Sequence, residues 1–354
     1  MNTTSRRSGS IDFFTHMLLR LLRMNNKFVF GTAAVLIIVS SIAAYLLEPN
    51  NFGSLFNGLW WVMTTVTTTG YGDFTPKTVP GKCLGMFLYV FGIGIISVTI
   101  SKIADSVFQF RRREEEGKLK YQGEQHFVMV DWSKNTELAI QEVLRSDPDM
   151  DIVLIDTMDR TPIVHNRVHY VQGIPTELET LEQANMTKAR AVFIFAKETT
   201  QDDALLRDTS FVDGKTLLVA TTIERNYNHV HTVVEIKDRS NMQNFIHIKV
   251  DEFILGSETI SQLAVRSAFH PGSSRIISQL LTREYGDNLY EVERRSGWVT
   301  YRDAFTALLQ EGATLISDGD QLNINRRLDH FIPEDARLFV ICDKDTIQRL
   351  QLRL

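Results

Sequence analysis

The stretch Thr67-Thr68-Thr69-Gly70-Tyr71-Gly72-Asp73 lies between two apolar segments, each long enough to cross a bilayer. Glycine at alternating positions allows backbone angles that other residues reach only with strain. An extended run of such residues can point successive carbonyl oxygens to one side, and four copies around an axis would then replace the water shell of a cation. A lone Gly-Tyr-Gly is typical of a surface turn, so it is the flanking segments that favour the cation-binding interpretation.

Two uncharged segments flank this motif. Phe28 to Leu47 is a run of twenty residues without a charge, which at ~1.5 Å per residue covers about 30 Å, one hydrocarbon thickness. Leu84 to Ile100 is a second uncharged run, of seventeen residues, and it continues amphipathically to Phe110. Each run alone is also compatible with a buried core helix, but a pair that brackets the motif predicts two membrane spans.

Basic residues set the expected orientation. They precede the first span and follow the second, whereas the loop between the spans carries only Lys77 and Lys82. The positive-inside rule therefore predicts cytoplasmic termini and an outside motif. Residues 11–24 (IDFFTHMLLRLLRM) are short, amphipathic and basic, which predicts an interfacial helix on the inner membrane surface, with a cytoplasmic helix packed on another domain as the alternative.

The segment Leu55 to Thr67 is apolar but too short to span a bilayer. It predicts a re-entrant helix whose C-terminal end points at the motif, where the negative end of the helix dipole favours a cation. Trp60 and Trp61 are candidates to hold Tyr71 in place, or to pack as ordinary aromatic residues. Asp73 is expected to fix the motif by a hydrogen bond behind it, or to add negative potential at the outer mouth.

These residues resemble the Thr-Val-Gly-Tyr-Gly selectivity filter of potassium channels, with Thr69 in the valine place. One loop supplies only a quarter of such a filter, so the resemblance implies a homotetramer surrounded by lipid. Gly92, in the stretch FGIGII, takes the place of the inner-helix hinge glycine of related calcium-gated prokaryotic potassium channels, and close helix packing is the equal alternative. The residues that the resemblance assigns to a potassium filter are Thr68, Thr69, Gly70, Tyr71 and Gly72.

The chain changes character after residue 110. Residues 111–123 are charged and predict a linker or a solvated helix end. Strands and helices then alternate, which is typical of a parallel, doubly wound sheet. The expected strands are 127–130, 152–155 with Asp156 at the end, 168–172, 191–196, 232–236 and 252–255, and the expected helices are 136–144, 177–184 and 215–224.

Four stretches resemble the regulator-of-potassium-conductance (RCK) domain, a Rossmann-like module found behind two-span pores. They are FVMVDWSKNTELAI, IVLID, HYVQGIPTELETLEQANMTKARAVFIFA and TVVEI. The resemblance covers most of residues 28–283. It implies a cytoplasmic N-terminus (1–27), an α-helical pore domain (28–110), a linker (111–123), a Rossmann-like domain with crossover helices (124–283) and a small α+β C-terminal subdomain (284–354).

The C-terminal subdomain is expected to have strands at 289–294, 314–317, 321–324 and 337–342, and a helix at 301–310. In the family such a subdomain binds small effectors at a dimer interface, with cyclic dinucleotides and metal ions as known classes. Arg326 and Arg327 are candidates to meet phosphates there, or are simply exposed arginines.

The first strand–helix turn departs from the dinucleotide fingerprint Gly-x-Gly-x-x-Gly, because residues 131–136 read DWSKNT. Without glycines the backbone cannot approach a pyrophosphate in the usual way. Asp131 would repel phosphate, and Lys134 is expected to offset that only in part. Asp156 occupies the ribose-binding position, or else caps a helix. An adenosine or mononucleotide ligand stays open, whereas the rival interpretation, a membrane-anchored nucleotide-dependent oxidoreductase, lacks both the glycine turn and a catalytic constellation.

The calcium site of calcium-gated relatives is not conserved in residue type. By alignment its positions hold Phe195, Glu235 and Lys237. Calcium takes six to eight oxygen ligands, so one carboxylate beside a lysine argues against a calcium site. The acidic residues Glu198, Asp202, Asp203 and Asp208 are expected to be solvated.

Composition bounds the remaining classes. The net charge of −5 gives no general attraction for nucleic acid, and Cys83 and Cys342 do not make a disulfide framework. No span carries an arginine repeat, so a voltage sensor is not expected. The sequence thus predicts a potassium-selective channel of the cell membrane, not an enzyme, gated by a ring of RCK domains that sense a nucleotide, a cyclic dinucleotide or a divalent cation. A nonselective cation channel is the alternative.

Overall fold

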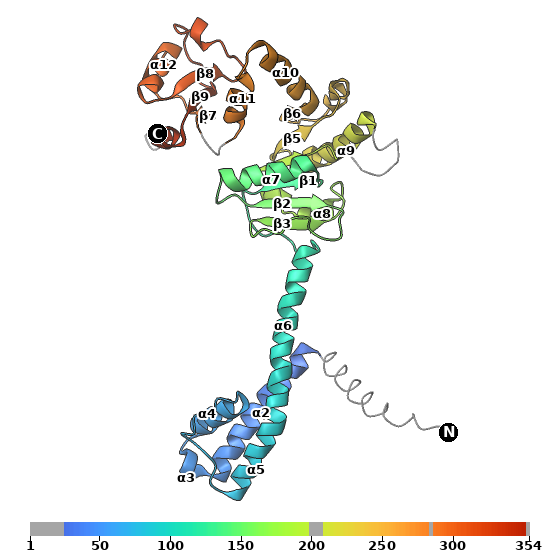
Figure 1. The fold of residues 1–354 in the computed structure, drawn as a ribbon, viewed down its shortest axis with the longest axis vertical. Coiled ribbons are helices and arrows are strands. Elements are labelled where there is room, and N and C mark those ends of the chain that lie inside the picture. Colours follow the sequence, from blue (N-terminus) through green and yellow to red (C-terminus); the bar gives the residue numbers. More distant parts are fainter. Residues whose placement is uncertain (1–24, 198–207, 283–285, 352–354) are drawn as a thin grey trace, which may run out of the picture. The chain divides into compact units, whose positions relative to one another are not determined.

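The computed structural model describes residues 25–197, 208–282 and 286–351 (Figure 1). Two compact units are present, residues 1–113 and residues 114–354. The expected interfacial helix at 11–24 and three members of the acidic loop, Glu198, Asp202 and Asp203, lie outside the described residues. Asp208 is described, and its side chain caps the helix that follows it.

The first unit is helical. Both expected spans are helices that are long and apolar enough to cross a membrane, Asn26–Leu47 and Val79–Glu115. The second is continuous but contains one π-helical turn, and it runs five residues past Phe110 into the expected linker. The elements are α2 (Asn26–Leu47), α3 (Pro49–Phe52), α4 (Leu55–Val66), α5 (Val79–Phe87), the π-helix η1 (Leu88–Gly92) and α6 (Ile93–Glu115).

Small residues let α4 pack closely on α2. Ser41 and Ala44 are buried on α2, and a Cβ added at Gly58 of α4 would lie 2.8 Å from the carbonyl oxygen of Ser41. Elsewhere α2 exposes large apolar side chains, including Val35 at 60% and Leu46 at 70%. The core helix of a soluble protein would bury such side chains, so their exposure fits a helix that faces lipid.

The second unit begins with the expected doubly wound sheet (Figure 1). Six parallel strands lie in the order β3-β2-β1-β4-β5-β6. The strand after Arg190 is two residues shorter than expected, and α9 is longer at both ends. The strands are β1 (Phe127–Val130), β2 (Ile152–Asp156), β3 (Val168–Gln172), β4 (Ala191–Ile194), β5 (His231–Glu235) and β6 (Glu252–Ile254), and the helices are α7 (Lys134–Ser146), α8 (Leu178–Gln183) and α9 (Thr209–Tyr227).

Each face of this sheet has its own core. On one face, Val128 of β1 and Val153 of β2 pack with Leu181 of α8 and Ile223 of α9. On the other face, Met129 of β1 packs with Ile140 of α7 and with further residues of β2 and β3. Strands buried on both faces read as continuous apolar runs, which is why the sequence predicted them well.

The remaining elements are two helices, α10 (Gly256–Phe269) and α11 (Ser273–Leu281), and the C-terminal subdomain. The subdomain holds a three-stranded antiparallel sheet in the order β7-β9-β8. Its elements are β7 (Asn288–Val292), α12 (Tyr301–Gln310), β8 (Thr314–Asp318), β9 (Leu338–Cys342) and α13 (Lys344–Gln351).

The expected strand at 321–324 is wrong. Gln321 forms only an isolated bridge with Asp318, and Ile324 begins the 3-10 turn η5 (Ile324–Arg326). Alternating polar and apolar residues suggested a strand, but asparagines flank Ile324 and favour turns. The turn buries Ile324 in the subdomain core and leaves Leu322 exposed.

Candidate functional site

The candidate filter follows directly after α4. Thr68, Gly70 and Gly72 have φ angles of 62°, 55° and 79°. Left-handed residues thus alternate with Thr69 and Tyr71, the pattern that directs successive carbonyl oxygens to one side. The backbone N–H groups of Thr69 and Gly70 both donate to the carbonyl oxygen of Thr64, at 2.8 and 3.0 Å. The last turn of α4 therefore anchors the start of the filter.

Trp60 supports the filter from behind. Its ring stacks on Tyr71 with centroids 5.7 Å apart and planes 5° apart, and its indole N–H donates to Asp73 at 2.7 Å. Trp61 lies in the core of the pore domain against Phe52, with the two ring centroids 5.5 Å apart. The two tryptophans therefore differ in what they touch: one holds the filter, the other joins α4 to α3.

Glu48 is a second filter support that the sequence did not reveal. It follows α2, is buried, and accepts hydrogen bonds from the N–H groups of Lys77 and Thr78 at 2.8 to 3.0 Å. The Thr78 hydroxyl and the Asn51 amide donate to it as well. Burial alone would raise the pKa of Glu48, but these hydrogen bonds hold its pKa below the usual range. A carboxylate thus ties the loop after the filter to the end of α2.

Gly92 is a point of close contact. It ends the π-helical turn η1, and a Cβ there would lie 2.7 Å from Cγ1 of Val66 at the end of α4. At Gly94 an added Cβ meets nothing within 4 Å. The geometry supplies a packing reason for glycine at position 92, and the hinge role stays a prediction.

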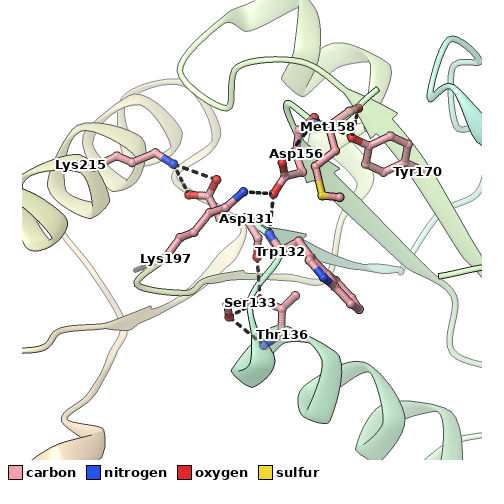
Figure 2. Close-up of polar contacts among 9 residues, drawn as sticks. All are labelled: Asp131, Trp132, Ser133, Thr136, Asp156, Met158, Tyr170, Lys197 and Lys215. Atoms are coloured by element: carbon pink, nitrogen blue, oxygen red, sulfur yellow. Dashed lines mark hydrogen bonds and ion pairs between the residues drawn. The ribbon is translucent and has the colours of Figure 1, made fainter. Parts of the chain in front are cut away.

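The turn after β1 keeps a glycine-like backbone without glycine (Figure 2). Asp131 has a φ of 66°, a left-handed angle that aspartate tolerates better than most residues. The Thr136 hydroxyl donates to the Asp131 carbonyl oxygen at 2.6 Å, and Ser133 caps α7 by accepting the N–H of Thr136 at 3.1 Å. Side chains therefore close the turn where the fingerprint has glycines.

Asp156 lies fully buried at the end of β2 (Figure 2). Oδ2 accepts the N–H of Trp132 and the ammonium of Lys197, each at 2.6 Å, and Oδ1 accepts the N–H of Met158 at 3.1 Å. Burial would raise the pKa of Asp156, but Lys197 and the Trp132 N–H outweigh it and hold the pKa below the usual range. Asp156 is thus an ionised, internally paired carboxylate.

Asp131 is paired with a lysine that the sequence did not indicate. Lys215 of α9 donates to both of its carboxylate oxygens, at 2.8 and 2.7 Å. Lys134 lies exposed and pairs with Glu137 one turn along α7, and its partial offset of phosphate repulsion stays a prediction. Lys215 lies 84 positions after Asp131, so only the packing of α9 on the sheet brings the two side chains together.

Glu235, at the end of β5, is also paired internally. It accepts hydrogen bonds from the Asn135 amide at 2.9 Å, the Ala196 N–H at 3.0 Å and the Lys237 ammonium at 3.0 Å. Phe195 stacks against Phe193 and offers no ligand atom. Among the residues that the structure describes, no group of three or more His, Cys, Asp or Glu side chains is arranged to hold a metal ion.

The segment that follows α6 is hydrogen-bonded to the Rossmann-like domain. We call residues 115–125 the strap. The Gln172 N–H of the edge strand β3 donates to the Gly117 carbonyl at 3.1 Å, and the Thr161 N–H donates to the Glu115 carbonyl at 2.8 Å. Tyr121 donates to Asp151 at 2.8 Å. The expected linker is therefore ordered along its second half.

The guanidinium of Arg327 in the C-terminal subdomain is already hydrogen-bonded to other residues of the chain. It donates to Gln321, Tyr301 and Asp318 and lies over the Tyr301 ring. Arg326 is exposed. A separate cavity of about 570 Å³ opens beside residues that include Arg294, Arg295 and Trp298.

Comparisons with known proteins match two separate parts of the chain. A family model described as ion channel matches residues 32–109, and one described as calcium-activated potassium channel slowpoke-like RCK domain matches residues 141–234. The putative potassium channel protein YugO of Bacillus subtilis is 33% identical over 228 residues, covering 64% of this chain and 67% of that protein. The chain belongs to the potassium channels with an RCK domain. This family conducts potassium under the control of a ligand-sensing RCK domain, and it is a family of membrane proteins and not an enzyme class.

Further relatives and solved structures are similar to parts of the chain. The calcium-gated potassium channel TvoK of Thermoplasma volcanium is 26% identical over 269 residues, covering 75% of this chain and 76% of that protein. Among solved structures, GsuK bound to ADP aligns with a TM-score of 0.42 and the human SLO3 gating ring with 0.48, both at 14% identity over 64% of this chain. The chain covers 59% and 46% of those two solved chains, less than two thirds of either.

Proposed function

We propose that four copies of this chain form a potassium-selective pore in the cell membrane, with the filter outside, both termini in the cytoplasm and the RCK domains in a cytoplasmic gating ring. The observation that carries the proposal is the alternation of left-handed residues at Thr68, Gly70 and Gly72, held by Trp60 and Asp73. Stacked rings of carbonyl oxygens are what a potassium ion needs in place of water.

The tetramer rests on two features. A single re-entrant helix supplies one quarter of a closed filter. Helices α10 and α11 bury no residue within the chain, and they expose Ile260, Phe269, Ile276 and Leu281. An apolar helix pair of this kind fits a contact between copies of the RCK domain.

The strap supports direct coupling between the RCK domain and span two. Glu115 is the last residue of α6, and its carbonyl oxygen also accepts a hydrogen bond from the N–H of Thr161 in the Rossmann-like domain. Gly117 has a φ of 65°, and a Cβ there would collide with the backbone of Gln172. We infer that motion of the Rossmann-like domain reaches span two through this attachment.

The effector is proposed to be organic. Candidate places are the carboxyl ends of β1, β2 and β4, which is the position of the ligand cleft in doubly wound sheets, and the cavity beside Trp298. A divalent cation at Glu235 is a poorer fit, because Lys237 already neutralises that carboxylate.

Reconstituted protein tests the pore. We expect the reversal potential of single-channel currents to lie near the potassium value when potassium and sodium gradients oppose each other. A reversal near zero would instead establish the nonselective cation channel. The mass of the detergent-solubilised particle should correspond to four chains, and a conducting monomer would contradict the proposed assembly.

A further inference from the structure

Ribose recognition in doubly wound folds depends on a carboxylate at the end of the second strand. That carboxylate accepts hydrogen bonds from the ribose hydroxyls, in the crevice where the strand order reverses. The chain has the carboxylate, Asp156, in the right place. Whether a nucleoside can use it depends on what already contacts its oxygens.

Both oxygens of Asp156 are already engaged. Its side chain is 0% exposed, whereas that of its partner Lys197 is 24% exposed. Lys197 is thus the more exposed partner of the pair, and its ammonium already occupies one oxygen of the carboxylate that a ribose would need (Figure 2). Lys197 comes three residues after β4, the strand that pairs with β1 on the side away from β2. It therefore crosses the point of strand-order reversal to reach the end of β2.

We propose that Lys197 is an internal occupant of the ribose position, so that a nucleoside binds this cleft only when Lys197 leaves Asp156. The inference rests on the proposed role of the RCK domain as the effector sensor. Exchanging a buried charge pair for neutral hydroxyl donors is unfavourable, since hydrogen bonds between ionised partners are about twice as strong as neutral ones. The nucleotide site that the fold offers is closed here by the chain's own side chain.

Adenosine is the sharpest probe, because it carries the ribose without phosphates. The cleft holds the carboxylates of Asp131 and Asp156 with the ammonium groups of Lys215 and Lys197. Removing Lys197 leaves an excess of negative charge there, which would oppose the phosphates of ADP but not a neutral nucleoside. The proposal therefore predicts a larger gain in affinity for adenosine than for ADP.

The experiment is calorimetric titration of adenosine into the purified full-length chain. We expect Lys197→Ala to bind at least about tenfold more tightly than the parent, a ratio that reflects the loss of one charge-assisted bond. Lys197→Arg keeps a cation for Asp156 and should behave as the parent. Lys344→Ala is the control, because Lys344 is an exposed lysine at the start of α13 in the C-terminal subdomain.

Equal adenosine affinity in the parent and in Lys197→Ala, or no binding to either, would overturn the proposal. If Lys197→Ala does not fold, the double variant Lys197→Ala with Asp156→Asn removes the buried charge together with its partner. Its amide oxygen can still accept a ribose hydroxyl, so it should also exceed the parent. Binding is measured without current, so a failure here is distinguishable from a failure of the proposed pore.

Discussion

The filter and the Rossmann-like cleft use the same backbone conformation for different ends. Gly70 in the filter has a φ of 55°, and Asp131 in the cleft has a φ of 66°. In the proposed filter the backbone carbonyls would themselves be the ligands, and two of the three left-handed positions there are glycines. In the cleft the left-handed residue contributes a carboxylate that Lys215 neutralises. The proposed function of the first region thus depends on its backbone, and that of the second depends on its side chains.

This contrast predicts which changes each region tolerates. A filter built from main-chain oxygens is broken by any substitution that alters φ, whatever its charge. In a site built from ion-paired side chains, replacing both members of a pair together should preserve the fold and change the ligand preference. The following substitutions test the two halves of that statement.

The largest expected effect is at the filter. Gly70→Ala or Gly72→Ala should abolish potassium-selective current, because a Cβ at positive φ costs about 1–2 kcal/mol and moves the carbonyl out of line. The thermal unfolding of the RCK domain should change little. Gly214→Ala is the control, since its added Cβ meets nothing within 4 Å and lies in α9. Normal selective conductance in both filter variants would show that the filter lies elsewhere.

Glu48 tests whether the filter needs its side-chain supports. Glu48→Ala removes the charged acceptor for the N–H groups of Lys77 and Thr78, and hydrogen bonds to a charged group contribute about 1.5–3 kcal/mol each. We expect a less stable tetramer and current that decays during sustained opening. Glu137→Gln, an exposed change on α7, should alter neither. Steady current and an unchanged melting temperature in Glu48→Ala would reduce the role of this carboxylate to packing.

An effect of intermediate size is expected from a substitution in the strap, which should change gating and leave ion selectivity unchanged. Gly117→Ala introduces a strained φ and a collision with Gln172, so the strap should detach from β3. We expect the reversal potential to stay near the potassium value while open probability no longer follows the state of the RCK domain. Gly297→Ala adds a Cβ in open space and is the matched control. Gating that matches the parent in Gly117→Ala would show that force reaches span two by another route.

Local sequence patterns were enough to predict most of the helices and strands. All six parallel strands were predictable because each is a continuous apolar run, and the spans and α4 were predictable from length and charge. The expected strand at 321–324 had alternation but no partner strand. Site contacts were harder, because Lys197 reaches Asp156 across 41 positions and Lys215 reaches Asp131 across 84. Glu48 was missed for the same reason, since its donors lie 29 and 30 positions away.

The smallest expected effect concerns calcium. Glu235 is the one carboxylate left at the positions where calcium-gated relatives have ligands, and Lys237 lies 3.0 Å from it. Calcium needs six to eight oxygens, so we expect open probability to depend little on micromolar calcium in the parent channel. Glu235→Ala should leave that weak dependence unchanged, because the carboxylate serves Asn135 and the Ala196 N–H instead of an ion.

The same substitution also separates a calcium ligand from a structural anchor. Removing an anchor should lower the melting temperature of the RCK domain with or without calcium, whereas removing a ligand should lower it only when calcium is present. Glu235→Gln keeps an acceptor for the Ala196 N–H and should restore much of the stability. If the parent channel opens at micromolar calcium and Glu235→Ala does not, Glu235 is a calcium ligand and the prediction is wrong.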